Sequence, residues 1–295
     1  MSADTSPTGP ARLEPLDPER LARTLTTRWL GRPCLCLAAC ASTNDVAAER
    51  GRAGAAEGLV VLAESQTGGR GRLGRAWHSP AGANLTFSVL LRPARPPDEV
   101  PPLTLLAGAA VAAALAQLVA PAGLVPRLKW PNDVQLARVG ARVPGESSDG
   151  GPPRNPARNP PLKIAGILTE MASEGNRVGH VVVGIGLNVN DTALPPDLAD
   201  RATSLALATG HSLDRTAVLA TVLAALEEAY DDFRAAGPAA AVRRWATHGA
   251  VGTRCRVRVA GRDLEGVALG IDPDGALRVA DDDGRIHRVV SGEIT

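Results

Sequence analysis

The sequence predicts an α+β fold, in which helices flank a β-sheet and a small β-barrel follows at the C-terminal end. Short apolar runs at 58–63 and 84–91 have the length and composition of buried strands. Long helical patterns occur at 103–120 and 214–236. From residue 251 onward, short alternating strands are separated by turns rich in Asp and Gly, which is typical of a small barrel.

The chain divides into three parts. Residues 1–16 are rich in Pro, Ser, Thr and Gly with little to bury, so we expect them to be disordered. Residues 17–248 form the main domain, and residues 249–295 form the barrel. Within the main domain, residues 140–161 hold many glycines and prolines and almost nothing apolar, which predicts a disordered surface insertion. The content is 44% hydrophobic but only 2% aromatic, so Ala, Val and Leu must build the core.

The N-terminal part of the main domain begins with one helix. Asp17 is placed to cap it and Pro18 occupies its first turn, and the pattern extends to about residue 30. A strand follows at about 34–39. A helix-turn-helix module needs about three helices, so we expect no DNA-binding domain and no operator binding.

The segment Ser42-Thr43-Asn44-Asp45 resembles a capping box, with a hydroxyl at the cap and an acid three residues later. This pattern alone favours a structural role. The alternative is that the same hydroxyls and the exposed amides of the helix start bind a polar group of a ligand.

The uncharged stretch 103–125 predicts a buried core helix at 103–120 rather than a membrane span. Alanine contributes little transfer energy, and a proline and a glycine interrupt the run. The remaining elements expected in the main domain are a strand leading into Lys129, consecutive strands at 163–171 and 179–190, and helices at 214–236 and 238–247.

Composition excludes several classes of function. A net charge of +1 and the scarcity of aromatic residues argue against a general nucleic-acid binder. The cysteines at 34, 36, 40 and 255 have no histidine nearby to complete a zinc site, so we expect free thiols. The N-terminus has no signal-peptide pattern, which is consistent with a reducing cytoplasm.

The most informative segment is the loop from Gln66 to Trp77, in which four glycines alternate with three arginines. Glycine lets the backbone approach a bound molecule closely, and the arginine fork suits carboxylate or phosphate. We therefore expect a mobile loop that folds over an anionic ligand. Segment 68–75 should be poorly ordered until that ligand binds.

Lysine is the second signal, because only two of the 32 basic residues are lysine, Lys129 and Lys163. In a chain that otherwise uses arginine, a lysine indicates a position where a compact ammonium is needed. Chance under the composition bias is the alternative. A nucleophile with a neighbouring base is not evident, and the phosphate-binding motif Gly-x4-Gly-Lys-[Ser/Thr] is absent. A site that consists of hydrogen-bond donors and cations acts by neutralising anions and holding them in line for reaction.

Five motifs, in order and spacing over about residues 40–290, resemble the biotin protein ligases, also called biotin–[acetyl-CoA-carboxylase] ligases. They are Ser42-Thr43-Asn44, Gly69-Arg70-Gly71-Arg72-Leu73-Gly74-Arg75-Ala76-Trp77, Lys129-Trp130-Pro131-Asn132-Asp133, Lys163-Ile164-Ala165-Gly166-Ile167-Leu168 and Gly184-Ile185-Gly186-Leu187-Asn188. The resemblance implies a class II aminoacyl-tRNA synthetase/biotin synthetase-like catalytic domain with a mixed sheet, and an SH3-like C-terminal barrel.

The resemblance also implies site residues. The expected catalytic residues are Lys163, Arg70 and Arg72. The expected biotin-binding residues are Ser42, Thr43, Asn44, Gln66, Gly69, Arg70, Gly71, Arg72, Lys163, Gly166 and Gly184. The expected ATP-binding residues are Arg75, Trp77, Lys129, Asn132, Asp133, Gly186 and Asn188. A core role for Trp77 and a solvated position for Arg75 are the alternatives. Protein ligands to a metal are not expected, because Mg²⁺ accompanies ATP.

The implied reaction has two steps. Biotin and ATP give biotinyl-5′-AMP and pyrophosphate, and a lysine of the biotin carboxyl carrier protein of acetyl-CoA carboxylase then takes the biotinyl group. Two other functions remain as alternatives: a lipoate or octanoate protein ligase or transferase of related fold, and a non-catalytic RNA- or single-strand-binding module. The oligomeric state is left open, and no membrane partner is expected.

Overall fold

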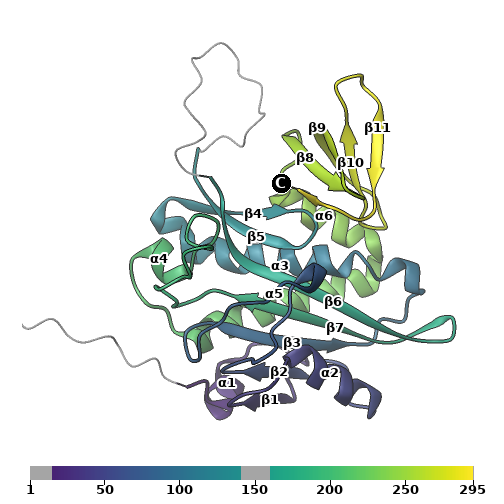
Figure 1. Ribbon diagram of the computed structural model, residues 1–295. Helices are drawn as coiled ribbons and strands as arrows, with labels where there is room; N and C mark the ends of the chain where they lie inside the picture. Colours follow the sequence, from purple (N-terminus) through teal and green to yellow (C-terminus); the bar gives the residue numbers. More distant parts are fainter. Residues whose placement is uncertain (1–14, 141–159, 295) are drawn as a thin grey trace, which may run out of the picture.

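The computed structural model describes residues 15–140 and 160–294, which form a large mixed sheet with flanking helices and a smaller C-terminal sheet (Figure 1). The helices are α1 (Pro18–Thr24), α2 (Thr43–Arg52), α3 (Leu103–Val119), α4 (Leu205–Thr209), α5 (Arg215–Ala236) and α6 (Pro238–His248). The strands are β1 (Cys34–Leu37), β2 (Val60–Ala63), β3 (Leu85–Leu91), β4 (Leu124–Lys129), β5 (Asp133–Arg138), β6 (Leu162–Glu174), β7 (Arg177–Leu187), β8 (Arg254–Val259), β9 (Arg262–Ile271), β10 (Leu277–Ala280), β11 (Ile286–Val289) and β12 (Glu293–Ile294).

The large sheet has the order β1-β2-β3-β7-β6-β5-β4. Its β1–β2 pair is parallel and its other pairs are antiparallel, so the sheet is mixed. The smaller sheet is antiparallel throughout, in the order β11-β10-β9-β8-β12. The predicted α+β fold with a small C-terminal β domain is confirmed.

The two faces of the large sheet have different surroundings, because side chains along a strand alternate between faces. On β2, Val60 and Leu62 belong to the main hydrophobic core, whereas Val61 packs in a second cluster with Ala47 of α2. Helices α3, α5 and α6 pack together on the main-core face and α2 covers part of the other (Figure 1). The face that α2 leaves partly open carries the candidate site described below.

Helix α3 confirms the predicted core helix. By length and composition the stretch Pro97–Ala122 could cross a membrane, but 67% of its most apolar window is buried inside the protein. It packs against α5, α6 and strands of the sheet. The apolar character of this helix is therefore explained by burial within the fold.

The N-terminal helix is shorter than predicted. Asp17 caps it as expected, but α1 ends at Thr24 and Leu25 is extended. Leu16, expected in the disordered segment, is buried, and its N–H donates to Glu64. The predicted disorder of residues 1–14, and of 141–159 within the insertion, lies outside the described residues.

A buried carboxylate explains the early end of α1. The Glu227 side chain, on α5, is 8% exposed and accepts backbone N–H bonds of about 2.9 Å from Arg28, Trp29 and Leu30. A continuous helix would use those N–H groups internally. Burial by itself raises the pKa of Glu227, but the backbone N–H donors outweigh it and leave the pKa below its usual value.

Replacing Glu227 with Ala should lower the free energy of unfolding by about 2–4 kcal/mol, because three buried N–H groups lose their acceptor. The matched control is Glu228→Ala, one residue along the same helix at a side chain that is 74% exposed, where we expect a change within about 0.5 kcal/mol. Urea unfolding measures both variants. Equal losses would contradict the capping role of Glu227.

The lowered pKa of Glu227 also predicts how stability depends on pH. The carboxylate's contribution is fully present above its unfolded pKa of about 4.3 and is lost as the pH falls through the lower folded value. Wild type should therefore lose more stability than Glu227→Gln between about pH 5 and pH 3. Parallel pH profiles of the two proteins would contradict this assignment.

Candidate active site

A cavity of about 850 Å³ opens on the face of the sheet that α2 partly covers. Its walls come from the start of α2, the Gly/Arg loop 66–78, the β4–β5 turn, strands β6 and β7, and segment 194–202. Gly69 is not a lining residue among those described; it accepts the Trp77 N–H at 3.0 Å and so closes the base of the loop. The other predicted site residues all line the cavity: Ser42, Thr43, Asn44, Gln66, Arg70, Gly71, Arg72, Arg75, Trp77, Lys129, Asn132, Asp133, Lys163, Gly166, Gly184, Gly186 and Asn188.

The start of α2 contributes uncharged hydrogen-bonding groups to one end of the cavity, beside the ion pair of Arg70 with Asp45. Ser42 is the N-cap residue, but its side chain makes no capping bond among the described residues, and Gln66 instead accepts the backbone N–H of Thr43 at the start of the helix. The Gln66 Oε1 accepts from both the N–H and the hydroxyl of Thr43, at 2.7 and 3.1 Å. The Ser88 hydroxyl lies 2.7 Å from the Thr43 hydroxyl and 2.6 Å from Asn44 Oδ1. These groups form a connected set of neutral donors and acceptors.

Asn44 is positioned by close contact with the sheet. Its Nδ2 donates to Glu170 Oε2 at 2.6 Å, and its Oδ1 faces Gly184 on β7. A Cβ at position 184 would lie 2.1 Å from that oxygen, so a side chain cannot be accommodated unless Asn44 moves. Gly184 is therefore required for the position of the Asn44 amide.

Two glycines facing each other across β6 and β7 form a flat shelf next to this end. Gly166 pairs with Gly186, and the Trp77 ring lies on both: a Cβ at these positions would meet ring atoms at 2.9 and 2.2 Å. The shelf thus supports an indole ring in this structure. The Nζ of Lys163 lies 5.4 Å from the centroid of that ring, at cation–π distance.

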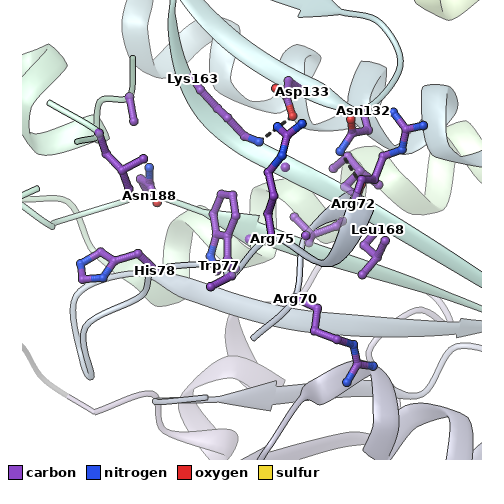
Figure 2. A pocket seen from close by; sticks show the side chains of 18 of the residues that line it. Arg70, Arg72, Arg75, Trp77, His78, Asn132, Asp133, Lys163, Leu168 and Asn188 are labelled. Atoms are coloured by element: carbon purple, nitrogen blue, oxygen red, sulfur yellow. Dashed lines mark hydrogen bonds and ion pairs between the residues drawn. The ribbon is translucent and has the colours of Figure 1, made fainter. Parts of the chain in front are cut away.

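Lys163 is held firmly at the start of β6. Its backbone N–H donates to Arg201 and its carbonyl accepts from Thr203, each at 2.8 Å. Its side chain is 31% exposed, and its Nζ lies 2.6 Å from Asp133 Oδ1 (Figure 2). The two predicted lysine motifs therefore meet at one ion pair, between residues 30 positions apart in the sequence.

The three arginines of the loop do not act as one group. Figure 2 shows the Arg70 guanidinium directed away from Arg72 and Arg75. Arg70 binds the Asp45 carboxylate of α2 through two bonds of 2.8 and 2.5 Å, and this interaction lowers the pKa of Asp45. Asp45 is therefore the partner of Arg70 instead of the acid of a capping box.

The other two arginines reach the C-terminal domain. Arg72 Nη1 donates to the Gly292 carbonyl at 3.3 Å, and burial lowers the pKa of its guanidinium. Arg75 forms a bidentate ion pair with Glu293, with one bond of 2.7 Å, and these bonds lower the pKa of Glu293. The C-terminal domain thus contributes a carboxylate to the cavity.

Two predicted ATP-binding amides have structural partners. Asn132 Nδ2 donates to the Ile167 carbonyl, and the buried Asn188 Nδ2 donates to the Thr203 carbonyl, both at 3.0 Å. These bonds position the β4–β5 turn and the chain after β7, on either side of Lys163. Both residues line the cavity in addition.

Some lining or supporting residues were missed in the sequence. Ser88 and Glu170 could have been found from the alternation of side chains along a strand. On β3, Ser88 lies on the same face as Thr86, and on β6, Glu170 lies on the same face as Gly166. Segment 194–202, His78 and Glu293 had no such signal, because irregular segments and a separate domain bring them to the cavity.

The geometry is therefore a cavity with a neutral hydrogen-bonding end and a cationic end. Lys163, Arg70 and Arg75 each already bind a carboxylate of the protein. Such a site can accept an anionic ligand by exchange of ion-pair partners, and it can hold a neutral polar ring beside it.

Comparison with known proteins agrees with this geometry. Residues 37–188 match the biotin/lipoate A/B protein ligase family, and residues 251–295 match the biotin protein ligase C-terminal domain. The biotin–[acetyl-CoA-carboxylase] ligase of Mycobacterium tuberculosis is 36% identical over 256 residues, covering 86% of this chain and 85% of the relative. The bifunctional ligase/repressor BirA of Bacillus subtilis is 35% identical over 273 residues, covering 92% and 76%.

A solved structure shares the fold. The biotin protein ligase from Aquifex aeolicus in complex with biotin and ATP aligns with a TM-score of 0.67 at 27% identity, covering 89% of this chain and 97% of that protein. The chain therefore belongs to the biotin/lipoate A/B protein ligase family and carries the biotin protein ligase C-terminal domain.

Proposed function

We propose that this chain is an ATP-dependent biotin protein ligase, which makes biotinyl-5′-AMP and transfers the biotinyl group to a lysine of a biotin carboxyl carrier protein. The observation that carries the proposal is the Lys163 ammonium, 2.6 Å from Asp133 and above the Trp77 ring, in a cavity that the Gly/Arg loop also lines. The names of the relatives and of the aligned structure support the same reaction.

In the first step, a carboxylate oxygen of biotin attacks the α-phosphorus of MgATP. The bond from that phosphorus to the bridging oxygen of the β-phosphate breaks, and pyrophosphate leaves. Both reactants are anions, so their approach requires fixed cations. Lys163 serves this role between carboxylate and α-phosphate, and Arg72 and Arg75 serve the phosphates. The Trp77 indole N–H, buried and without a partner among the described residues, is a further donor.

The neutral end of the cavity fits the ureido ring of biotin. A urea is uncharged and offers two N–H donors and one carbonyl acceptor. The hydroxyl of Thr43 and the amides of Asn44 and Gln66 provide matching groups without a charge, and the buried Ser88 hydroxyl holds Thr43 and Asn44 in place behind them. Gly184 keeps the sheet flat beside them, and Gly166 and Gly186 leave room for Trp77 to cover the ring and tail.

In the second step, the amine of the carrier lysine attacks the carbonyl carbon of the mixed anhydride. The bond between that carbon and the phosphate oxygen breaks, AMP leaves, and the amine loses a proton. The anhydride hydrolyses if water reaches it, so the Gly/Arg loop is assigned to cover it. Once AMP has left, the ammonium of Lys163 forms its ion pair with Asp133 again.

The proposal places the chain in the cytoplasm, where ATP and the carrier are available. The four cysteines, all free, fit a reducing compartment. The acceptor is the biotin carboxyl carrier protein of acetyl-CoA carboxylase. DNA and membranes are not among the proposed partners.

An isotope exchange assay distinguishes this function from the lipoate or octanoate alternative. We expect labelled pyrophosphate to enter ATP only when biotin is present, and not with lipoate or octanoate. Incubation with biotin, ATP and a carrier domain should then add one biotinyl group to the carrier, detected by mass spectrometry. Exchange driven by lipoate, or a carrier of unchanged mass, would refute the proposal.

Lys163→Arg should lower the rate of biotin-dependent exchange by about two to three orders of magnitude. The guanidinium keeps the charge, but it is larger and cannot occupy the position of Nζ between Asp133 and the Trp77 ring. Arg177→Lys, a charge-conserving change at the exposed first residue of β7, is the control and should leave the rate unchanged. A rate for Lys163→Arg near that of wild type would remove Lys163 from the mechanism.

Gly184→Ala should weaken biotin binding by about ten- to a hundredfold, because the new methyl group must displace the Asn44 amide, a cost of about 1–3 kcal/mol. Calorimetric titration of biotin measures the effect. Gly179→Ala on the same strand is the control, since the nearest atoms to its methyl group would belong to the flexible Glu174 side chain. The assignment of the neutral end to biotin is wrong if the two variants bind biotin equally well.

A further inference from the structure

The C-terminal domain supplies an acidic side chain to a cavity built for anions. Glu293, on β12, lines the cavity and binds the Arg75 guanidinium through both oxygens. The neighbouring carbonyl of Gly292 accepts from Arg72. Two of the three arginines of the Gly/Arg loop are thus occupied by consecutive residues of another domain.

The C-terminal domain is itself anchored to a site motif. The indole N–H of Trp130, buried beside the β4–β5 turn, donates to the Gly275 carbonyl at 3.0 Å. The cores of the two domains are continuous, since Val257 and Leu277 belong to the same cluster as the main domain. Glu293 is therefore presented to the loop from a fixed position.

The loop between these contacts is held in an unfavourable conformation. Leu73, at its tip, has φ = 57°, in the left-handed region, and is 76% exposed. An exposed leucine with that backbone angle persists only when its surroundings impose it. Contacts outside the loop flank Leu73 on both sides: Arg70 binds Asp45 of α2, Arg72 binds the carbonyl of Gly292, and Arg75 binds Glu293 of β12.

We propose that Glu293 is a positioning residue, an anionic clasp that holds Arg75 in the ligand-free protein and releases it to the phosphates of the nucleotide. This inference rests on the proposed function for the identity of the ligand. A carboxylate in the place of a phosphate repels the nucleotide, so the two compete for one guanidinium. The clasp keeps the loop in one position. Because only molecules with a released Arg75 bind the nucleotide, the apparent affinity for ATP falls as the clasped fraction rises.

The test compares Glu293→Gln with Asp282→Asn. Asp282 binds Arg254 through two bonds of 2.7 Å in the same domain and does not line the cavity, so it controls for the loss of one bidentate carboxylate. Glu293→Asp keeps the charge and serves as the conservative rescue. Circular dichroism checks that all three variants are folded.

The first readout is trypsin cleavage after Arg75 in the ligand-free proteins, quantified by mass spectrometry. Trypsin must bind the guanidinium that Glu293 occupies, so Glu293→Gln should be cleaved at least about threefold faster than wild type. Asp282→Asn should be cleaved at the wild-type rate, and Glu293→Asp at a rate between the two. Equal cleavage of Glu293→Gln and wild type would overturn the clasp.

The second readout is the KM for ATP in biotin-dependent pyrophosphate exchange. We expect Glu293→Gln to lower this KM by about threefold or more while kcat changes less than about twofold. A KM equal to or above that of wild type would overturn the competition between Glu293 and nucleotide. If wild type itself shows no exchange, the proposed function fails, and the cleavage rates alone decide whether the clasp exists.

Discussion

The candidate chemistry depends on one ammonium group held at a fixed point. Lys163 is the second residue of β6, and both its backbone N–H and its carbonyl are bound by the segment that follows β7. Its Nζ lies between Asp133 and the Trp77 ring, so the charge has a defined position before any ligand arrives. Preorganised charge of this kind needs no rearrangement when negative charge shifts during a reaction.

The large sheet positions the other groups of the site, because one of its faces packs in the core and the other carries the cavity. Odd positions of β7, from Val181 to Leu187, pack in the main core with α3 and α5. On the other face, Val182 packs in the second hydrophobic cluster, and Gly184 and Gly186 line the cavity, where they leave space for Asn44 and Trp77. A stable core and an open site are thus built from the same strand, because its period is two residues.

Carboxylates of the protein pair with three of the cations that line the cavity. Asp133 binds Lys163, Asp45 binds Arg70, and Glu293 binds an arginine near the tip of the loop. Unpaired cations gathered in one cavity would repel one another, so internal carboxylate partners stabilise this arrangement. Ligand binding then becomes an exchange of partners, and its free energy is a difference between two sets of ion pairs.

By itself, the sequence determined the order and type of most elements, the core helix α3 and a set of site residues that, apart from Gly69, all line the cavity. The elements follow from local properties, namely periodicity and turn residues, whereas the site residues follow from the resemblance of five motifs to the biotin protein ligases. It could not show that α1 ends at Thr24, since the carboxylate responsible, Glu227, is about 200 positions away. Only the tertiary structure decided which cation binds which carboxylate, and that Glu293 reaches the cavity from another domain. The partners of such a pair lie far apart in the sequence and come close together only in the folded structure, so no local sequence pattern predicts them.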